Sequence, residues 1–105
     1  MTDTLARLFA TIEARAGADP AASHTGALLA KGPGRCAEKF GEEAVEAIVA
    51  AASGDRGGLT REAADVLYHL QVLLAAAGVE WDAVLAELER REGRSGIAEK
   101  ASRAD

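Results

Sequence analysis

Apolar residues recur along this chain at helical spacing, and polar or glycine-rich breaks separate the helical stretches. The breaks fall at Gly17, at residues 32–34, at residues 53–58 and at Gly78. Between them, spacings of three and four residues place apolar side chains on one face of each stretch, and no alternating pattern typical of strands appears. The pattern predicts an all-α fold of five helices, at about residues 5–16, 20–31, 35–52, 60–77 and 81–91.

Local residues mark where several of these helices begin and end. Asp19 and Pro20 predict the start of the second helix, because proline is tolerated in a first turn. Thr60 is the predicted N-cap of the fourth helix, and Gly78 is its predicted C-terminal stop. Residues 53–58 then form a turn, and the helices that it joins must run antiparallel if it is tight. An antiparallel helix pair is therefore the predicted centre of the fold.

The helix predicted at residues 60–77 carries apolar side chains around most of its circumference. A helix of this kind is normally buried on several sides, which is hard to achieve within a small chain. We therefore expect a helical bundle completed by association into a homodimer or a higher homo-oligomer, with a central helix in a monomer as the alternative. The residues that carry this expectation are Val66, Leu67, Leu70, Val72, Leu73 and Leu74.

Composition limits the setting and the partners. The chain has 105 residues, and we expect one domain at residues 1–91 and a basic, partly ordered tail at residues 92–105. A net charge of −5 argues against a protein that coats nucleic acid. The longest run without charged residues, 66–79, is too short to span a membrane. Cys36 is the single cysteine, which excludes an intrachain disulfide, so we expect a cytoplasmic protein.

Four carboxylates form two pairs, each with a spacing of three residues. They are Glu43 with Glu46, and Glu62 with Asp65. This spacing places both members of a pair on one helix face, where like charges repel. No lysine or arginine lies in residues 40–53 or between Glu62 and Glu80 to compensate them. The arrangement favours a cation supplied from outside the chain.

An antiparallel helix pair would bring these four carboxylates close together across the turn. Oxygen ligands suit Mg²⁺, with Mn²⁺ as a substitute, and magnesium held by carboxylates usually completes its shell with water and substrate phosphate. The predicted chemistry is phosphoryl or nucleotidyl transfer to water. A solvated, glutamate-rich helix face is the alternative, since this spacing alone is a weak signal.

The residues around these acids resemble one family. KFGEEAVEAIVAA (39–51) followed by EAADVLYHLQVLL (62–74) is similar to the phosphoribosyl-ATP pyrophosphohydrolases of histidine biosynthesis. These belong to the all-α, MazG-like nucleoside triphosphate pyrophosphohydrolases. SHTGALLAKG (23–32) and RSGIAEKASR (94–103) narrow the resemblance to this family. His24 departs from the pattern, since the family often has an aromatic residue there.

The resemblance implies an activity and roles for the acids. Enzymes of this family hydrolyse the α–β phosphoanhydride of phosphoribosyl-ATP and release pyrophosphate and phosphoribosyl-AMP. It implies a nucleotide as the small-molecule substrate and Mg²⁺ as the cofactor. The metal ligands that it implies are Glu43, Glu46, Glu62 and Asp65. The catalytic residues that it implies are Glu42, Glu43 and Glu46, one of which would take a proton from the attacking water.

Further residues are candidates for contact with the substrate. His69, four residues after Asp65, is predicted to hydrogen-bond a metal-holding carboxylate, and a buried core histidine is the alternative. Tyr68 is expected to pack with its hydroxyl bonded. The other candidates have plainer alternatives, because lysines form ion pairs on helices, hydroxyl residues cap helices and charged tails are usually solvated. They are Lys39, Lys31, Ser23, Thr25 and Arg91, with Arg94, Lys100 and Arg103 in the tail.

Two other functions remain open at this point. One is a housecleaning pyrophosphohydrolase that acts on dUTP, dCTP or damaged nucleotides and shares the same acids. The other is a non-catalytic helical dimerisation module, in which the acids form only a solvated face. The second predicts no dependence on metal and little loss when Glu46 is replaced by alanine.

Overall fold

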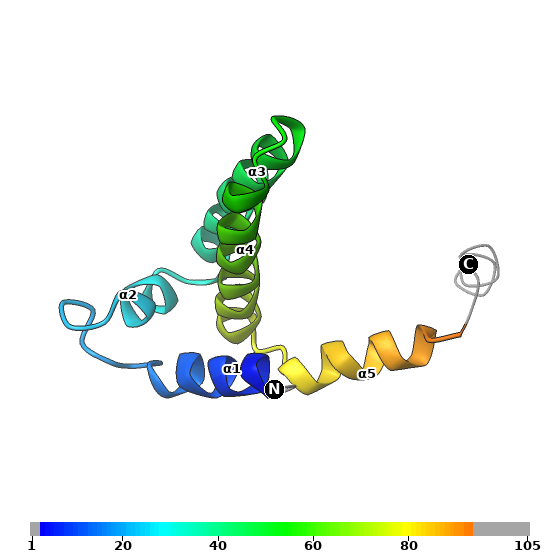
Figure 1. Cartoon of the computed structure of the whole chain (residues 1–105). Coiled ribbons are helices and arrows are strands. Elements are labelled where there is room, and N and C mark those ends of the chain that lie inside the picture. The colour runs from blue at the N-terminus through cyan, green and yellow to red at the C-terminus, as the bar shows by residue number, and fades with distance from the viewer. Residues whose placement is uncertain (1–2, 94–105) are drawn as a thin grey trace.

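The computed structural model describes residues 3–93, and these form helices connected by short loops, with no strand among them (Figure 1). The all-α fold class predicted from the sequence is confirmed. Most of the predicted tail, including Arg94, Lys100 and Arg103, lies outside the described residues. The helices are α1 (Thr4–Ala14), α2 (His24–Ala30), α3 (Pro33–Ala52), α4 (Arg56–Ala77) and α5 (Trp81–Arg91).

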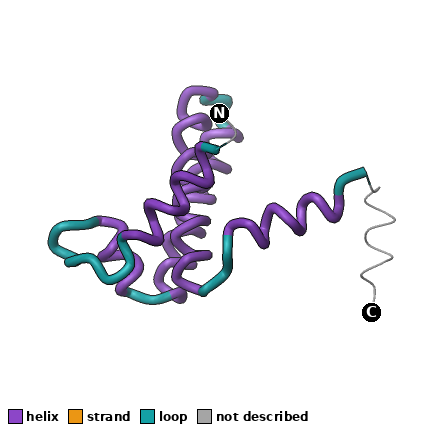
Figure 2. The backbone as a smooth tube through the Cα atoms, turned by 90° about the horizontal axis from the view of Figure 1, so that it is seen from below, coloured by secondary structure: helices purple, strands orange, loops and turns teal. Residues whose placement is uncertain are grey.

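The two longest helices, α3 and α4, form an antiparallel hairpin at the centre of the molecule (Figures 1 and 2). The turn between them consists of residues 53–55, which is shorter than the six-residue turn predicted. α1 and α2 pack near the end of the hairpin that is opposite this turn. The hairpin therefore provides the two adjacent helix faces that carry the acids.

The prediction of Thr60 as the N-cap of α4 is wrong. Asp55 is the N-cap, and its Oδ1 accepts a hydrogen bond from the backbone N–H of Gly58 at 2.8 Å. A side chain at position 58 would overlap the Asp55 carboxylate, so glycine permits this close approach. The Thr60 hydroxyl instead donates to the carbonyl of Arg56 within the helix, at 3.0 Å. Gly78 ends α4 in the left-handed conformation, as predicted.

The prediction that the second helix begins at Asp19 and Pro20 is also wrong. Ser23 is its N-cap, since the Ser23 hydroxyl accepts a hydrogen bond from the backbone N–H of Gly26 at 2.9 Å. The Asp19 carboxylate accepts from the N–H of Ala21 in a separate turn. α3 begins slightly earlier than predicted, with Pro33 in its first turn, where a missing N–H costs nothing.

The core lies toward the open end of the hairpin, where α1 and α2 join it. Its buried cluster consists of Ile12, Leu28, Cys36 and Val72. Gln71, fully buried on α4, donates from Nε2 to the carbonyl of Leu5 at 2.9 Å and so fixes α1 against α4. Packing at this end leaves the turn end of the hairpin without a covering layer among the described residues.

α5 is attached to the rest of the molecule mainly through Trp81, which is buried. Its ring stacks on Phe9 of α1, with ring centroids 6.3 Å apart. Beyond this contact, α5 extends away from the other helices in both views (Figures 1 and 2). Among residues 3–93, no single helix is long and apolar enough to span a membrane. α4 and α5 pass that test only as a pair bent by 112°.

Large apolar side chains are exposed on the part of α3 near the turn. Val45, Ile48 and Val49 are 56%, 65% and 59% exposed. Leu59 and Leu67 on α4, also partly exposed, add to the apolar surface of the hairpin. Exposed apolar surface of this extent marks interaction sites in soluble proteins.

Candidate metal and nucleotide site

Three carboxylates converge between α3 and α4. Glu43 extends from α3, and Glu62 and Asp65 extend from α4, with carboxylate oxygens that all lie within 4.8 Å of one another. Glu43 is buried, Glu62 is half-buried and Asp65 is exposed. The antiparallel pairing of the two helices brings these residues together across about twenty positions of sequence, as the folding of the hairpin requires.

Glu46 lies outside this group of three but adjoins it. Its side chain is exposed, and its charge acts on Glu62. Burial, followed by the charge of Glu46, raises the pKa of Glu62 above its ordinary value. The charges of Asp65 and Glu43 raise this pKa further. The ionised form of Glu62 is therefore disfavoured unless a positive charge compensates the cluster.

Lys39 supplies a positive charge on the α3 side of the cluster. Its Nζ lies 3.5 Å from Oε2 of Glu43 and 3.7 Å from Oε1 of Glu42. Glu42 is exposed and points to a different part of the α3 surface from the buried Glu43. One ammonium shared by two carboxylates leaves the acids of α4 without a lysine or arginine partner among the described residues.

His69 lies buried beside the cluster. Burial lowers the pKa of its imidazole, Glu43 and Asp65 act to raise it, and Lys39 and His24 act to lower it. Its ring packs edge-on against Tyr68, with ring centroids 4.9 Å apart. Within residues 3–93, His69 forms no hydrogen bond with a carboxylate, so the predicted bond is not part of this conformation.

The two hydroxyl residues of α2 that the sequence singles out already have partners. Ser23 caps its helix, and Oγ1 of Thr25 shares a hydrogen bond of 2.5 Å with the Tyr68 hydroxyl. The expectation that the Tyr68 hydroxyl is bonded is confirmed. This bond connects α2 to α4 directly beside His69. Lys31 is exposed immediately after the last residue of α2.

Arg91 lies at the end of α5, which extends away from the α3–α4 hairpin (Figure 1). Its Nε donates to the carboxylate of Glu87 at 2.8 Å. Hydrogen bonds from Arg90 and Arg91 lower the pKa of Glu87 to about 2. The structure does not bring Arg91 together with the acids of the hairpin within one described chain.

The acidic cluster fits a hard divalent cation. Oε1 of Glu62 is buried and has no hydrogen-bond partner among the described residues, so a carboxylate oxygen is left uncompensated. An octahedral Mg²⁺ with ligands at about 2.1 Å places its oxygens about 3 to 4.2 Å apart. The spread of 4.8 Å in the cluster is only slightly larger. A set of donors made only of carboxylate oxygens suits Mg²⁺ or Mn²⁺ rather than zinc.

Similarity to known proteins over nearly the whole chain decides the family. A family model described as phosphoribosyl-ATP pyrophosphohydrolase matches residues 5–92. The chain belongs to this family. A relative from Dinoroseobacter shibae, named phosphoribosyl-ATP pyrophosphatase, is 73% identical over 99 residues, covering 94% of this chain and 97% of the relative.

Further relatives carry the same name. The one from Rhodobacter capsulatus is 69% identical over 99 residues, covering 94% of this chain and 96% of the relative. The one from Methylobacterium radiotolerans is 65% identical over 100 residues, covering 95% of this chain and 94% of the relative. The similarity therefore extends over nearly the whole of each protein.

In this member of the phosphoribosyl-ATP pyrophosphohydrolase family, a depression that the sequence does not predict lies beside the acids. It has a volume of about 340 Å³ and lies at the turn end of the hairpin. Arg61 also lines this depression. Its position immediately before Glu62 is the feature of the sequence from which a role for Arg61 beside the acids could have been predicted. The polar side chains that line the depression are Glu46, Ser53, Asp55, Arg61 and Glu62.

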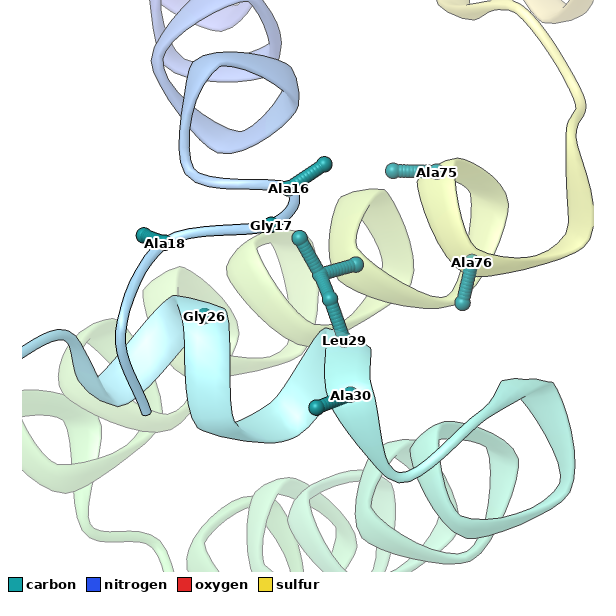
Figure 3. Close-up of a pocket in the computed structure, with 8 residues that line it drawn as sticks. All are labelled: Ala16, Gly17, Ala18, Gly26, Leu29, Ala30, Ala75 and Ala76. Atoms are coloured by element: carbon teal, nitrogen blue, oxygen red, sulfur yellow. The ribbon is translucent and has the colours of Figure 1, made fainter. Parts of the chain in front are cut away.

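A second hollow lies away from the acids, between the loop after α1, the helix α2 and the C-terminal part of α4 (Figure 3). Its volume is also about 340 Å³. Leu29 points into the space between Ala16 and the two alanines of α4, Ala75 and Ala76 (Figure 3). Alanine, glycine and leucine line this hollow, so it has no side chain that could move a proton or bind a phosphate.

Proposed function

We propose that this chain hydrolyses the α–β phosphoanhydride of phosphoribosyl-ATP to phosphoribosyl-AMP and pyrophosphate, as a step of histidine biosynthesis. The observation that carries the proposal is the cluster of Glu43, Glu62 and Asp65, with its uncompensated oxygen, in a chain that matches the family over residues 5–92. The name shared by the relatives supports the same substrate.

In this proposal, Glu43, Glu62 and Asp65 hold Mg²⁺, for which Mn²⁺ can substitute. Glu46 completes the ligand set, since it already adjoins Glu62 and its side chain is exposed. When bound, the ion neutralises phosphate charge and orients the anhydride toward water. The metal-binding function of the cluster also explains why the chain retains repelling acids between two packed helices.

The carboxylates of α3 also supply a base. Hydrolysis forms one bond from the water oxygen to phosphorus, breaks the bridging P–O bond, and releases pyrophosphate as the leaving group. The water proton passes to a carboxylate, and the candidates are Glu42, Glu43 and Glu46. Glu42 and Glu46 are exposed and can reach water, whereas Glu43 is enclosed between the helices and serves better as a ligand.

Substrate binding is assigned first to Lys39, whose ammonium lies beside the cluster. A phosphate brought to the metal would compete with Glu42 and Glu43 for this lysine, and would gain a charge-assisted hydrogen bond. Ser23 and Thr25 retain acceptor or donor capacity beyond their present bonds, since a hydroxyl has one donor and two lone pairs. Lys31 and Arg91 remain predictions that rest on the resemblance.

A second copy of the chain completes the bundle in this proposal. The exposed apolar residues of the hairpin, centred on Val45, Ile48 and Val49, support a homodimer because burial of such a face would stabilise it. Cytoplasmic localisation stays a prediction from the single cysteine, Cys36.

The test is pyrophosphate release in the presence of Mg²⁺, measured in parallel on phosphoribosyl-ATP, ATP, dUTP and dCTP. We expect phosphoribosyl-ATP to have the highest kcat/KM. Equal values for all four substrates would favour a housecleaning enzyme over the proposed one. The absence of any turnover, together with no stabilisation by Mg²⁺, would leave only a non-catalytic helical module.

A further inference from the structure

The depression at the turn end of the hairpin shares Glu62 with the acidic cluster, and the adjoining Glu46 also lines it. Glu46 and Glu62 line it on the side of the cluster, and Ser53, Asp55 and Arg61 line it on the side of the turn. The depression therefore adjoins the acids directly. Its volume of about 340 Å³ is large enough for a phosphate-bearing group.

Arg61 is the basic side chain of this depression, and it pairs with none of the acids around it. Among residues 3–93, it forms no hydrogen bond or ion pair, although Glu62 is its neighbour in sequence. Its guanidinium extends back toward the start of α4, where Nη1 would lie 3.8 Å from a side chain at Gly57. A guanidinium has five N–H donors in a planar fork, and here they remain available to a ligand.

The start of α4 is electrostatically suited to an anion. α4 has 22 residues, and its first turn contains Arg56 and no acidic residue. Arg61 follows in the second turn, so two arginines lie near the positive end of the helix dipole, where cations are disfavoured unless an anion is present. Three carboxylates line the depression: that of Asp55 is already engaged by the N–H of Gly58, and those of Glu46 and Glu62 lie on the side where the proposed function places Mg²⁺.

Basic side chains lie on both sides of the acids along the hairpin, an arrangement that fits an elongated, highly charged substrate. Lys39 lies one helical turn from Glu43 toward the open end of the hairpin, and Arg61 lies toward the turn. Ser53, the first residue of the turn after α3, is ten residues beyond Glu43, a distance of about 15 Å along the direction of the helix. Phosphoribosyl-ATP carries a triphosphate and a separate phosphate on its second ribose, so it has anionic groups well apart from the hydrolysed bond.

We propose that Arg61 binds a phosphate group of the substrate that lies outside the acidic cluster; the Ser53 hydroxyl, which also lines the depression, donates to the carbonyl of Ala50. This inference rests on the proposed function for the identity of the substrate. The recognised chemistry is a phosphate dianion, which the planar guanidinium can bind through two parallel hydrogen bonds. Two parts of the substrate offer it: the phosphates that leave as pyrophosphate, and the 5-phosphate of the phosphoribosyl group.

The first experiment compares Arg61→Gln with Arg56→Gln in steady-state hydrolysis of phosphoribosyl-ATP. Both arginines are exposed at the same end of α4, but Arg56 does not line the depression, so it is a matched control for charge. We expect Arg61→Gln to lower kcat/KM by about tenfold, as for loss of a charged hydrogen bond. Arg56→Gln should change it by less than about twofold. Arg61→Lys, which keeps the charge and loses the fork, should lie between Arg61→Gln and the parent.

The second experiment measures binding independently of turnover, by calorimetric titration with the two products in the presence of Mg²⁺. If Arg61 binds the departing phosphates, Arg61→Gln weakens pyrophosphate binding by about tenfold. If it binds the phosphoribosyl phosphate, the same variant weakens phosphoribosyl-AMP binding instead. Parental affinity of Arg61→Gln for both products would overturn the inference.

These outcomes separate the two proposals. A parent protein that leaves phosphoribosyl-ATP intact would refute the proposed function, and the titrations would still decide the role of Arg61. A parent that turns over the substrate, with Arg61→Gln and Arg56→Gln equally active, would refute only the inference about Arg61. Equal melting temperatures of the variants and the parent would show that a loss of binding is not a loss of fold.

Discussion

Replacing Asp65 by asparagine should stabilise the protein when metal is absent and should destabilise it, relative to the parent, when Mg²⁺ is present. The carboxylate oxygens of Asp65 and Glu43 lie within 4.8 Å. At this separation two like charges repel by about 1 kcal/mol at the dielectric constant of water, and by about 3.5 kcal/mol at an effective value near 20. Asp65 is exposed, so the lower figure applies. Without metal, Asp65→Asn should therefore be more stable than the parent by about 1 kcal/mol.

Magnesium should favour the parent instead. An ion that binds only the folded state stabilises it by about 2.7 kcal/mol at a concentration one hundred times its dissociation constant. For a domain of this size, that corresponds to a rise in melting temperature of roughly 10–20 °C. Asp65→Asn lacks one ligand oxygen charge and should gain much less than the parent at the same Mg²⁺ concentration.

The assay is thermal unfolding at fixed protein concentration, with EDTA or with millimolar Mg²⁺. Glu89→Gln, which removes an exposed carboxylate of α5 far from the hairpin, is the control and should gain as much from Mg²⁺ as the parent. Equal gains for the parent and Asp65→Asn would refute Asp65 as a ligand. A parent more stable than Asp65→Asn in EDTA would refute the repulsion.

Three further predictions concern the fold around the site. Asp55→Ala should cost about 1 kcal/mol in urea unfolding through loss of the cap, whereas Thr60→Ala should be neutral or stabilising. Tyr68→Phe should cost about 1 kcal/mol, and a double-mutant cycle with Thr25→Val should assign that cost to their shared bond; additive effects would contradict this. The pKa of Glu87 in the folded protein is lowered to about 2. The stabilisation of the fold by its ionised carboxylate is therefore fully present above pH 4.5, the ordinary pKa, and is lost as the pH falls toward 2. The stability difference between the parent and Glu87→Gln should therefore shrink between pH 4.5 and 3, and a constant difference would contradict the assignment.

Helical periodicity predicted the class of the fold and the antiparallel pair, because apolar spacing reflects which face of each helix is buried. It misplaced two helix starts, because each candidate cap had a competitor a few residues away. At α4, Gly57 and Gly58 resemble a turn by composition. In the structure Gly58 is helical and leaves room for the Asp55 carboxylate. This contact could not be predicted from the residue composition of the segment.

The sequence identified the acids of the candidate metal site, but it predicted only part of their arrangement in space. Spacing places Glu43 and Glu46 on one side of α3, yet only Glu43 lies in the group whose oxygens approach within 4.8 Å. Three residues advance a helix by about 300°, so the two side chains diverge by about 60° and one of them faces the partner helix more directly. Arg61 was missed because its neighbours across the turn, Ser53 and Asp55, become neighbours only in the folded hairpin.

The distribution of packing along the hairpin connects metal binding to self-association. The core is concentrated at the open end, while the middle of the hairpin holds mutually repelling acids and the part of α3 near the turn exposes Val45, Ile48 and Val49. α3 carries both Glu43 and this apolar face, so an ion that draws α3 toward α4 also fixes the face that a second copy would cover. By linkage, whatever Mg²⁺ contributes to association, association must contribute equally to Mg²⁺ affinity.

Association should accordingly be tighter with Mg²⁺ than with EDTA in sedimentation equilibrium. Ile48→Asp should weaken it in both conditions, because it places a charge in the centre of the apolar face. Leu88→Asp provides a control of equal chemistry on α5, where the side chain is 59% exposed but lies far from the acids. It should leave the effect of Mg²⁺ on association unchanged. Identical association constants with Mg²⁺ and with EDTA would show that the acids and the apolar face of α3 act independently.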